Sequence, residues 1–270
     1  MNELANLESP RLEVDILLCH LMKWERHSLY LHYCTELDPV DLESFQRMII
    51  RRRNREPLQH ITGVMEFLGK EFITGPDALV PRPETETLAE LFIGRLPAKP
   101  RLLLDTGTGS GILAASLALR YPSALVIGSD ISRAALTIAK HNMIRHGIDN
   151  VDLVEADLLK PFRTGTARFD GIIANLPYIP STEIDTLEPE VCFGDPRIAL
   201  DGGIDGLDLV RILLEEVPYL LQKNGVLALE LTSNQVPAVA EHISNDDNWC
   251  CVECGNDLTG RKRVVLANRT

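Results

Sequence analysis

The residues whose spacing best fits a chemical role form a glycine-rich loop with an acidic residue further along the chain. The loop, Asp-Thr-Gly-Thr-Gly-Ser-Gly at 105–111, follows a short apolar run and precedes a helix-like segment. Glycine lets a ligand approach the backbone without meeting a Cβ atom. Asp130 ends the next apolar run, where its two carboxylate oxygens suit two adjacent ribose hydroxyls. We therefore predict a nucleoside cofactor held by Gly107, Thr108, Gly109, Ser110, Gly111 and Asp130.

The spacing of the glycines distinguishes two kinds of nucleoside cofactor. They stand as G-x-G-x-G, whereas the fingerprint of dinucleotide-binding proteins is G-x-G-x-x-G. Asp105 precedes them, and a carboxylate there disfavours a pyrophosphate but attracts an ammonium or a sulfonium. The pattern favours S-adenosylmethionine over NAD. Two alternatives stay open: a dehydrogenase, for which nothing positions a hydride acceptor, and glycines that only form a tight turn.

A third apolar run ends in Glu-Ala-Asp-Leu at 155–158. Because it also ends at the carboxyl edge of the expected sheet, we predict that Asp157 lies near the base of the cofactor and accepts a hydrogen bond from its exocyclic amine. Leu158 would pack on the ring. The alternative is an aspartate in an exposed turn.

The segment Asn175-Leu176-Pro177-Tyr178 follows a fourth apolar run and suits the methylation of a planar nitrogen. The lone pair of an amide or an aromatic NH₂ is delocalised, so a site must hold both N–H groups to aim it. The side-chain oxygen of Asn175 and the carbonyl of Leu176 are the two acceptors we expect, with Asn175 also at the cofactor. Pro177 restricts Leu176 to extended geometry, and Tyr178 offers a flat face for stacking.

No general base is required by this chemistry. The methylated nitrogen is strongly acidic and can lose its proton to water, so positioning and partial desolvation supply much of the rate. A turn after a buried strand is the structural alternative for this segment.

The elements that must hold these residues alternate in type along residues 84–270. Apolar runs such as RLLLD, ALVIGSD, VDLVEAD, FDGIIAN and GVLALEL are separated by helix-like segments at 111–121, 132–146 and 206–222. This alternation predicts an α/β fold with a doubly wound sheet. A polar helix at 234–243 and the strands WCCVEC and RVVLAN follow, and we expect those strands to form an antiparallel edge pair.

The first part of the chain has a different pattern. Ser9-Pro10 and Asp38-Pro39 are helix-start signals, each followed by apolar residues at helical spacing. Residues 1–56 are therefore predicted to be a small helical domain, and the glycine-punctuated residues 57–83 a connecting β-hairpin. The basic run from Arg51 to Arg55 is interpreted as a solvated helix end that complements the helix dipole, with nucleic-acid contact as the alternative.

Composition excludes several classes of protein. The chain has 270 residues, and its 27 basic and 39 acidic side chains give a net charge of −12, which opposes binding to a nucleic-acid backbone. The cysteines lack zinc-site spacing, so we expect no metal. The start has no basic region before its apolar stretch, and no apolar run is long enough to span a bilayer. A cytoplasmic protein without a membrane segment is expected.

With these residues in view, the sequence resembles the release factor glutamine N5-methyltransferases nearly from end to end. The resemblance lies in SPRLEVDILL, RRRNREPLQHITGVMEFLGKEF, LVPRPETE, DTGTGSG, NLPYIP, GDPRIALDGGIDGLD and DLTGRKRVV. It implies a small N-terminal helical domain joined to a Rossmann-like, S-adenosylmethionine-dependent methyltransferase sheet. It also implies methylation of the side-chain amide of the GGQ glutamine in bacterial peptide-chain release factors.

By position, the resemblance implies that Gly107 to Gly111 and Asp130 hold S-adenosylmethionine, and that Asn175, Pro177 and Tyr178 bind the glutamine amide. The family pattern is NPPY, whereas this chain has Leu176 at the second place, which frees φ and restores an N–H. NLPY is also the form found in ribosomal RNA adenine dimethyltransferases. The PRPETE segment is expected to close over the site, with Arg82 and Glu86 as polar candidates.

Two other functions remain open from sequence. One is an adenine-N6 methyltransferase acting on RNA or DNA, which NLPY and the Arg51–Arg55 run favour and the net charge of −12 disfavours. The other is a non-catalytic protein that binds a translation factor and uses a nucleoside only as a switch. The intact NLPY segment argues against that reading.

Overall fold

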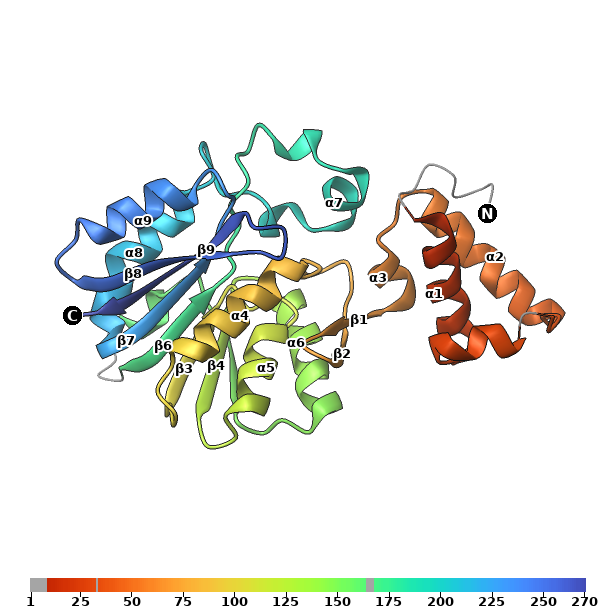
Figure 1. Cartoon of the computed structure of the whole chain (residues 1–270), viewed down its shortest axis with the longest axis horizontal. Helices are drawn as coiled ribbons and strands as arrows, with labels where there is room; N and C mark the ends of the chain where they lie inside the picture. The colour runs from red at the N-terminus through yellow and green to blue at the C-terminus, as the bar shows by residue number, and fades with distance from the viewer. Residues whose placement is uncertain (1–8, 33, 164–167) are drawn as a thin grey trace.

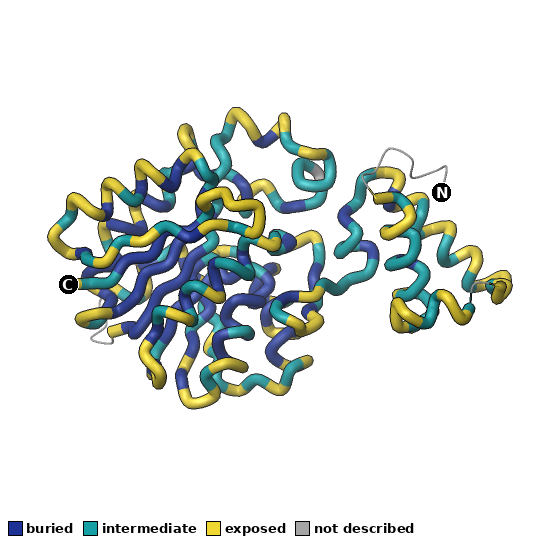
Figure 2. The backbone as a smooth tube through the Cα atoms, in the orientation of Figure 1, coloured by how far each residue is buried: buried dark blue, intermediate teal, exposed yellow. Residues whose placement is uncertain are grey.

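The computed structural model describes residues 9–32, 34–163 and 168–270. The prediction that the start of the chain has no basic region before its apolar stretch concerns residues 1–8, which lie outside the described residues. Figure 1 shows a helical unit at one end of the molecule, joined by a short connector to a larger α/β body. The strands at the centre of that body are its most continuously buried part (Figure 2). No helix in the described ranges has the length and apolar character needed to cross a membrane.

The N-terminal unit contains α1 (Pro10–Met22), the 3₁₀ helix η2 (Arg26–His32) and α2 (Pro39–Arg53). Asp38 caps α2 as expected, because its carboxylate accepts hydrogen bonds from the backbone N–H groups of Val40 at 2.9 Å and Asp41 at 2.8 Å. Ser9 precedes α1 as its start signal predicts, but its hydroxyl makes no cap hydrogen bond. Pro10 at the first turn still marks the start of that helix.

The basic run at the end of α2 is not a solvated helix end throughout. Arg52 is 6% exposed and pairs with Glu13 of α1 and Glu190 of α7 (Pro189–Gly194). Arg55 pairs with Glu188 and Glu190. The interpretation of this run as solvated is therefore wrong for Arg52, because acidic residues distant in sequence neutralise it and allow its burial. The pairs with Glu188 and Glu190 connect the helical unit to the body.

The connector contains a short helix, α3 (Leu58–Thr62), and the predicted hairpin, formed by β1 (Val64–Phe67) and β2 (Lys70–Ile73). A helix that the sequence did not lead us to predict, α4 (Pro83–Arg95), follows. Pro83 starts it, and Leu88, Ala89 and Phe92 bury its apolar side against the sheet. This helix carries the PRPETE segment to the carboxyl edge of the sheet.

The body is built on a sheet that within the described residues has seven strands, in the order β5-β4-β3-β6-β7-β9-β8. The first five in that order are parallel, which confirms the predicted α/β fold. They are β5 (Val151–Glu155), β4 (Leu125–Asp130), β3 (Leu102–Thr106), β6 (Phe169–Ala174) and β7 (Leu221–Glu230).

The predicted antiparallel pair is present as β8 (Trp249–Asn256) and β9 (Lys262–Arg269). Its position is partly wrong, because β9 lies between β7 and β8 and only β8 is at the edge. Val264, Val265 and Leu266 of β9 are buried on both sides, as an interior strand requires. The helix before the pair, α9 (Val236–Ser244), buries Val236, Val239 and Ile243.

Helices cover both faces of the sheet (Figure 1). One apolar cluster joins α8 (Asp208–Leu220) and α9 to one face, and the other joins α4, α5 (Ile112–Arg120) and α6 (Arg133–His146) to the opposite face. Strand order reverses at β3, whose neighbours are β4 and β6. Such a reversal opens a crevice at the carboxyl ends of the strands. Thr106 and Ala174, the last residues of β3 and β6, are paired in register. The glycine loop and the NLPY segment that follow them therefore begin side by side.

Candidate active site

A cavity of about 510 Å³ lies at the carboxyl ends of the parallel strands. This volume is in the range of about 300–1,000 Å³ that small-molecule sites occupy. It gathers predicted residues from four separate segments of the chain. Those that line it are Gly107, Thr108, Gly109, Ser110, Asp130, Asp157, Leu158, Asn175, Leu176 and Pro177. Gly111 and Tyr178 are not among its lining residues.

The glycine loop takes a conformation that its glycines permit. Gly107, Gly109 and Gly111 have φ values of 73°, 55° and 76°, in the left-handed region. A Cβ on Gly107 would lie 2.9 Å from Cδ2 of Leu176, so the loop packs tightly against the NLPY segment. A Cβ on Gly111 would lie 2.7 Å from Cβ of Ala139. Gly111 thus serves the contact with α6 and does not face the cavity.

Asp105 is fully buried beneath this loop and organises it. Its Oδ2 accepts hydrogen bonds from the Thr108 hydroxyl at 2.5 Å and from the backbone N–H of Ala114 at 3.0 Å. Its Oδ1 has no partner among the described residues. Burial raises the pKa of Asp105 to about 7, although these two hydrogen bonds oppose the rise. Asp105 holds the loop to the start of α5 and does not line the cavity.

Asp130 lies at the end of β4 and lines the cavity. Its Oδ2 accepts from the N–H of Gly109 at 2.8 Å, and its Oδ1 from the N–H of Ser132 at 2.8 Å. Burial raises its pKa, and these backbone donors oppose the rise. A carboxylate offers about four lone-pair positions, so both oxygens keep acceptor capacity for hydroxyl donors.

Asp157 and Leu158 line the cavity from the end of β5. Asp157 is exposed and forms an ion pair with Lys160. Leu158 has a φ of 51°, which is uncommon for a residue with a side chain. Its half-buried side chain packs at the margin of the apolar core under the cavity.

Asn175 brings an unpaired acceptor to the cavity. Its Nδ2 donates a hydrogen bond to the Thr85 hydroxyl at 3.1 Å, whereas its buried Oδ1 has no partner among the described residues. Leu176 is 4% exposed, and its side chain belongs to the core between the sheet and α8. At this position the family pattern has a proline, whose ring would restrict the backbone. In this chain the burial of the Leu176 side chain holds the segment in place instead.

Tyr178 lines a smaller hollow of about 60 Å³, which also includes Asn175 and Leu176. Its hydroxyl donates a hydrogen bond to Oε1 of Glu230 at 3.2 Å. Burial and the neighbouring Glu230 raise the pKa of Tyr178, so the hydroxyl stays protonated.

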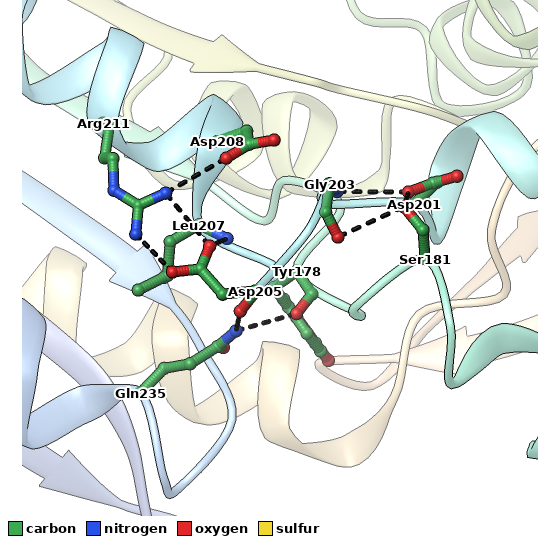
Figure 3. Close-up of polar contacts among 9 residues, drawn as sticks. All are labelled: Tyr178, Ser181, Asp201, Gly203, Asp205, Leu207, Asp208, Arg211 and Gln235. Atoms are coloured by element: carbon green, nitrogen blue, oxygen red, sulfur yellow. Dashed lines mark hydrogen bonds and ion pairs between the residues drawn. The ribbon is translucent and has the colours of Figure 1, made fainter.

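A glycine-containing loop, residues 201–208, supports the NLPY segment from behind. Gln235 donates from Nε2 to the carbonyl of Tyr178 at 2.9 Å and to that of Asp205 at 3.2 Å (Figure 3). A Cβ on Gly206 would lie 2.2 Å from the Tyr178 carbonyl oxygen, so only glycine allows this approach. Asp205 also pairs with Arg211 of α8, which ties the loop to the body.

The PRPETE segment reaches the cavity through residues other than the two expected polar candidates. Pro81 and Thr85 line it. Arg82 instead pairs with Asp195 at 2.9 Å, and Glu86 accepts from the N–H of Leu68 at 2.8 Å. These two residues fix the connector, while Thr85 meets Asn175.

Sequence reasoning missed Thr85, Glu230 and the apolar wall formed by Leu79, Ile198 and Leu209. Thr85 was within reach, because it is the polar residue between the two acidic ones of PRPETE. Glu230 lies one residue before the end of the apolar run GVLALEL, much as Asp105 and Asp130 end theirs, and an acidic residue at that position was the signal. No group of His, Cys, Asp and Glu that could hold a metal is found across the described ranges.

The sequence matches two family models. Residues 2–63 match the PrmC N-terminal domain, and residues 101–265 match a methyltransferase domain. The release factor glutamine methyltransferase of Geobacter sulfurreducens is 39% identical over 259 residues, which cover 96% of this chain and 89% of that protein. The corresponding enzyme of Moorella thermoacetica is 39% identical over 98% of this chain and 93% of its own.

This chain belongs to the release factor glutamine methyltransferase family. Solved structures at lower identity share its fold. A ribosomal protein L11 methylase from Lactobacillus delbrueckii has a TM-score of 0.52 and 22% identity, covering 73% of this chain and 83% of its own. A 16S rRNA N2 G1207 methyltransferase from T. thermophilus has a TM-score of 0.54 and 19% identity, covering 77% and 50%. The predicted Rossmann-like methyltransferase fold is thereby confirmed.

Proposed function

We propose that this protein transfers a methyl group from S-adenosylmethionine to the side-chain amide nitrogen of the GGQ glutamine of peptide-chain release factors. One observation carries the proposal: an unpaired amide oxygen, Oδ1 of Asn175, lies beside a cavity of nucleoside size. Family membership supports the same assignment, because two relatives that are 39% identical are named release factor glutamine methyltransferases.

The residues around the cavity fit the proposed cofactor. The backbone of Gly107 to Ser110 offers a close approach, and the Asp130 oxygens suit the ribose hydroxyls. Ala156, Asp157 and Leu158 would flank the base. When bound, S-adenosylmethionine supplies a methyl group on a sulfonium. The T. thermophilus neighbour, which shares the fold, is described in complex with AdoMet.

The substrate amide needs two acceptors for its two N–H groups, and the NLPY segment offers them. Oδ1 of Asn175 is one, and the backbone carbonyl of Leu176 is the other. Held in this way, the amide presents one face of its nitrogen, where the lone pair must point as the new bond forms. The packing of Leu176 against Gly107 links the acceptor carbonyl to the cofactor loop.

The proton released by the amide needs no side-chain base. Of the acidic residues that line the cavity, Asp130 accepts from Gly109 and Ser132, Asp157 pairs with Lys160, Asp201 accepts from the Ser181 hydroxyl, and Asp77 is exposed. A nitrogen that gains a methyl group becomes acidic enough to give its proton to water. The half-buried side chains of Leu79 and Leu209 limit the water around the reacting atoms, which strengthens the polar contacts there.

We also propose how the chain divides into domains. Residues 1–56 form a helical domain, residues 57–83 a connecting hairpin and residues 84–270 the methyltransferase domain. A release factor that presents its GGQ loop to the NLPY segment is the proposed partner, and the cytoplasm, where such factors act, is the proposed location.

The direct test is peptide mass mapping of a bacterial release factor after incubation with this protein and S-adenosylmethionine. We expect one added methyl group on the GGQ glutamine. A release factor with that glutamine changed to glutamate is the matched control, since it keeps the shape and lacks the amide. Methyl transfer to an adenine-containing RNA fragment treated in parallel, but not to the release factor, would overturn the proposal in favour of the adenine alternative. Absence of transfer to either would favour the binding protein.

A further inference from the structure

Four side chains from three parts of the chain meet behind the NLPY segment. Asn175 donates from Nδ2 to the Thr85 hydroxyl at 3.1 Å, and Tyr178 donates from its hydroxyl to Glu230 at 3.2 Å. The Thr85 hydroxyl also lies near the Glu230 carboxyl and lowers its pKa as a hydrogen-bond donor. Oε2 of Glu230 has no hydrogen-bond partner among the described residues, so it is the acceptor that remains for the Thr85 hydroxyl. The four side chains thus form a polar network in the order Asn175–Thr85–Glu230–Tyr178.

Glu230 lies at the end of β7 and is 2% exposed. Burial raises its pKa to about 7, while the hydrogen bonds from Thr85 and Tyr178 oppose the rise. The other charged groups that act on it are Glu84 of α4, which raises the pKa, and Arg263 of β9, which lowers it. Arg263 is shared with Glu84 at 3.5 Å and Asp257 at 3.4 Å. Glu230 therefore has no dedicated cation among its described neighbours.

The direction of each hydrogen bond in this network follows from which side chains can donate and which can only accept. An ionised carboxylate can only accept, so the single hydroxyl proton of Thr85 must go to Glu230. The Thr85 oxygen is then left as an acceptor, and only the NH₂ end of the Asn175 amide can satisfy it. The oxygen end of that amide is consequently turned away from Thr85, and it is the atom that has no partner.

We propose that Thr85 and Glu230 are positioning residues that orient the Asn175 amide so that its oxygen is free to accept the substrate N–H. This inference rests on the proposed function, because it assigns Oδ1 of Asn175 to the substrate amide. It adds two residues from α4 and β7 to the machinery, neither of which touches the reacting atoms. It also assigns a role to the charge of Glu230, which is to accept the hydroxyl proton of Thr85.

Protonation of Glu230 reverses the direction of these hydrogen bonds. A neutral carboxyl can donate to Thr85, whose hydroxyl can then donate to Asn175 and draw the amide oxygen away from the substrate. The inverted amide presents NH₂ to a substrate NH₂, and two donors cannot pair. Activity that depends on Glu230 is therefore lost as pH falls through about 7 and gained as pH rises.

The first experiment compares methylation rates of a release factor by the full-length protein and two variants at Thr85. Thr85→Val removes the hydroxyl at nearly constant volume, and Thr85→Ser restores it. We expect kcat to fall by about 10- to 100-fold in Thr85→Val, with the dissociation constant for S-adenosylmethionine unchanged, and to stay within about threefold in Thr85→Ser. Equal rates in wild type and Thr85→Val, or equal losses in both variants, would overturn the inference.

The second comparison uses pH, with Glu230→Gln as the variant. Glutamine has no charge to lose and can face Thr85 with either end. We expect the ratio of wild-type to variant kcat to rise between pH 5.5 and 8.5, with a midpoint of about 7. Other groups that titrate in this range, Asp105 included, act on both proteins alike and cancel in the ratio. A ratio that does not change with pH would contradict the role of Glu230.

A third measurement does not depend on turnover, so it separates failure of this inference from failure of the proposed function. The side-chain ¹H–¹⁵N pair of Asn175 is assigned by its loss in Asn175→Asp. Its chemical shift should move with pH around 7 in the wild type and stay constant in Glu230→Gln and Thr85→Val. The same pH dependence in all three proteins would overturn the inference, even if the release factor is methylated.

Discussion

The two halves of the site are built in opposite ways. The glycine loop is held by groups that are nearer to it in sequence: Asp105 binds Thr108 and Ala114, Asp130 binds Gly109 from 21 residues away, and Asn142 binds the Ser110 carbonyl from 32 residues away. The NLPY segment is held by side chains from far along the chain. Thr85 precedes it by 90 residues, Glu230 follows it by 52, and Gln235 by 57.

This difference separates two tasks. A cofactor of constant shape can be met by backbone N–H groups and carboxylates that a local turn already orients. An amide nucleophile must be aimed, and the aiming residues need support from several elements at once. We therefore expect changes at the glycine-loop end to alter cofactor affinity or stability, and changes at the NLPY end to alter the rate alone.

The largest effect should come from Asn175→Ala. Loss of the amide oxygen removes one of the two acceptors for the substrate, so kcat should fall by about 10²- to 10³-fold, as for loss of a preorganised polar contact in other enzymes. Calorimetry should give a cofactor dissociation constant near that of the wild type. Asn248→Ala, at an exposed position between α9 and β8, is the control and should keep full activity. Wild-type turnover in Asn175→Ala would remove the proposed role.

The next effect is on folding, at Gly111. An alanine there would take a φ of 76° and place its Cβ 2.7 Å from Ala139, so we expect a loss of about 3 kcal/mol of unfolding free energy from strain and overpacking. Gly147→Ala is a matched control, because its φ is 62° and nothing lies within 4 Å of the added Cβ. That variant should lose only about 1 kcal/mol. Denaturant unfolding that gives equal losses would show that the contact with α6 is unimportant.

Asp130→Ala should act on the cofactor. Removal of the carboxylate takes away the proposed ribose acceptors and frees the N–H of Gly109, so the cofactor dissociation constant should increase by about 10- to 100-fold. The exposed Asp247, which lies between α9 and β8 and does not line the cavity, makes a useful comparison, since Asp247→Asn should change the constant by less than about threefold. Unchanged affinity in Asp130→Ala by calorimetry would refute the ribose assignment.

The smallest effect expected is that of Gln235→Leu. It removes the hydrogen bond to the carbonyl of Tyr178, which is the residue of the NLPY segment farthest along the chain from Asn175 (Figure 3). We expect a decrease in kcat of about fivefold to tenfold, with cofactor affinity maintained. Weaker cofactor binding with an unchanged kcat would show that the two ends of the site are not separated as described.

The same contrast explains what could be predicted from sequence. The α/β alternation, the hairpin at 64–73 and the antiparallel pair at the end of the chain follow from local periodicity, and the structure contains them. The insertion of β9 between β7 and β8 does not, because strand order depends on contacts across the whole sheet. Helix α4 was missed because its first residue, Pro83, is also the last residue of the segment that we predicted to be a connecting hairpin.

At the site, the glycine loop and Asp130 could be located because their partners are near them in sequence. The partners of Asn175 and Tyr178 could not, since nothing in the pattern around Thr85 or Glu230 indicates that the fold brings them together. The burial of Arg52 was missed for the same reason, as its partner Glu190 is 138 residues away.

A crystal structure of the protein with S-adenosylhomocysteine and a GGQ-containing peptide would test the central claim most directly. The account predicts the nucleoside against Gly107 to Ser110 and Asp130. It also predicts the substrate amide nitrogen within about 3 Å of both Oδ1 of Asn175 and the carbonyl oxygen of Leu176. A glutamine amide bound away from these two oxygens, or paired with the Asn175 nitrogen, would contradict it.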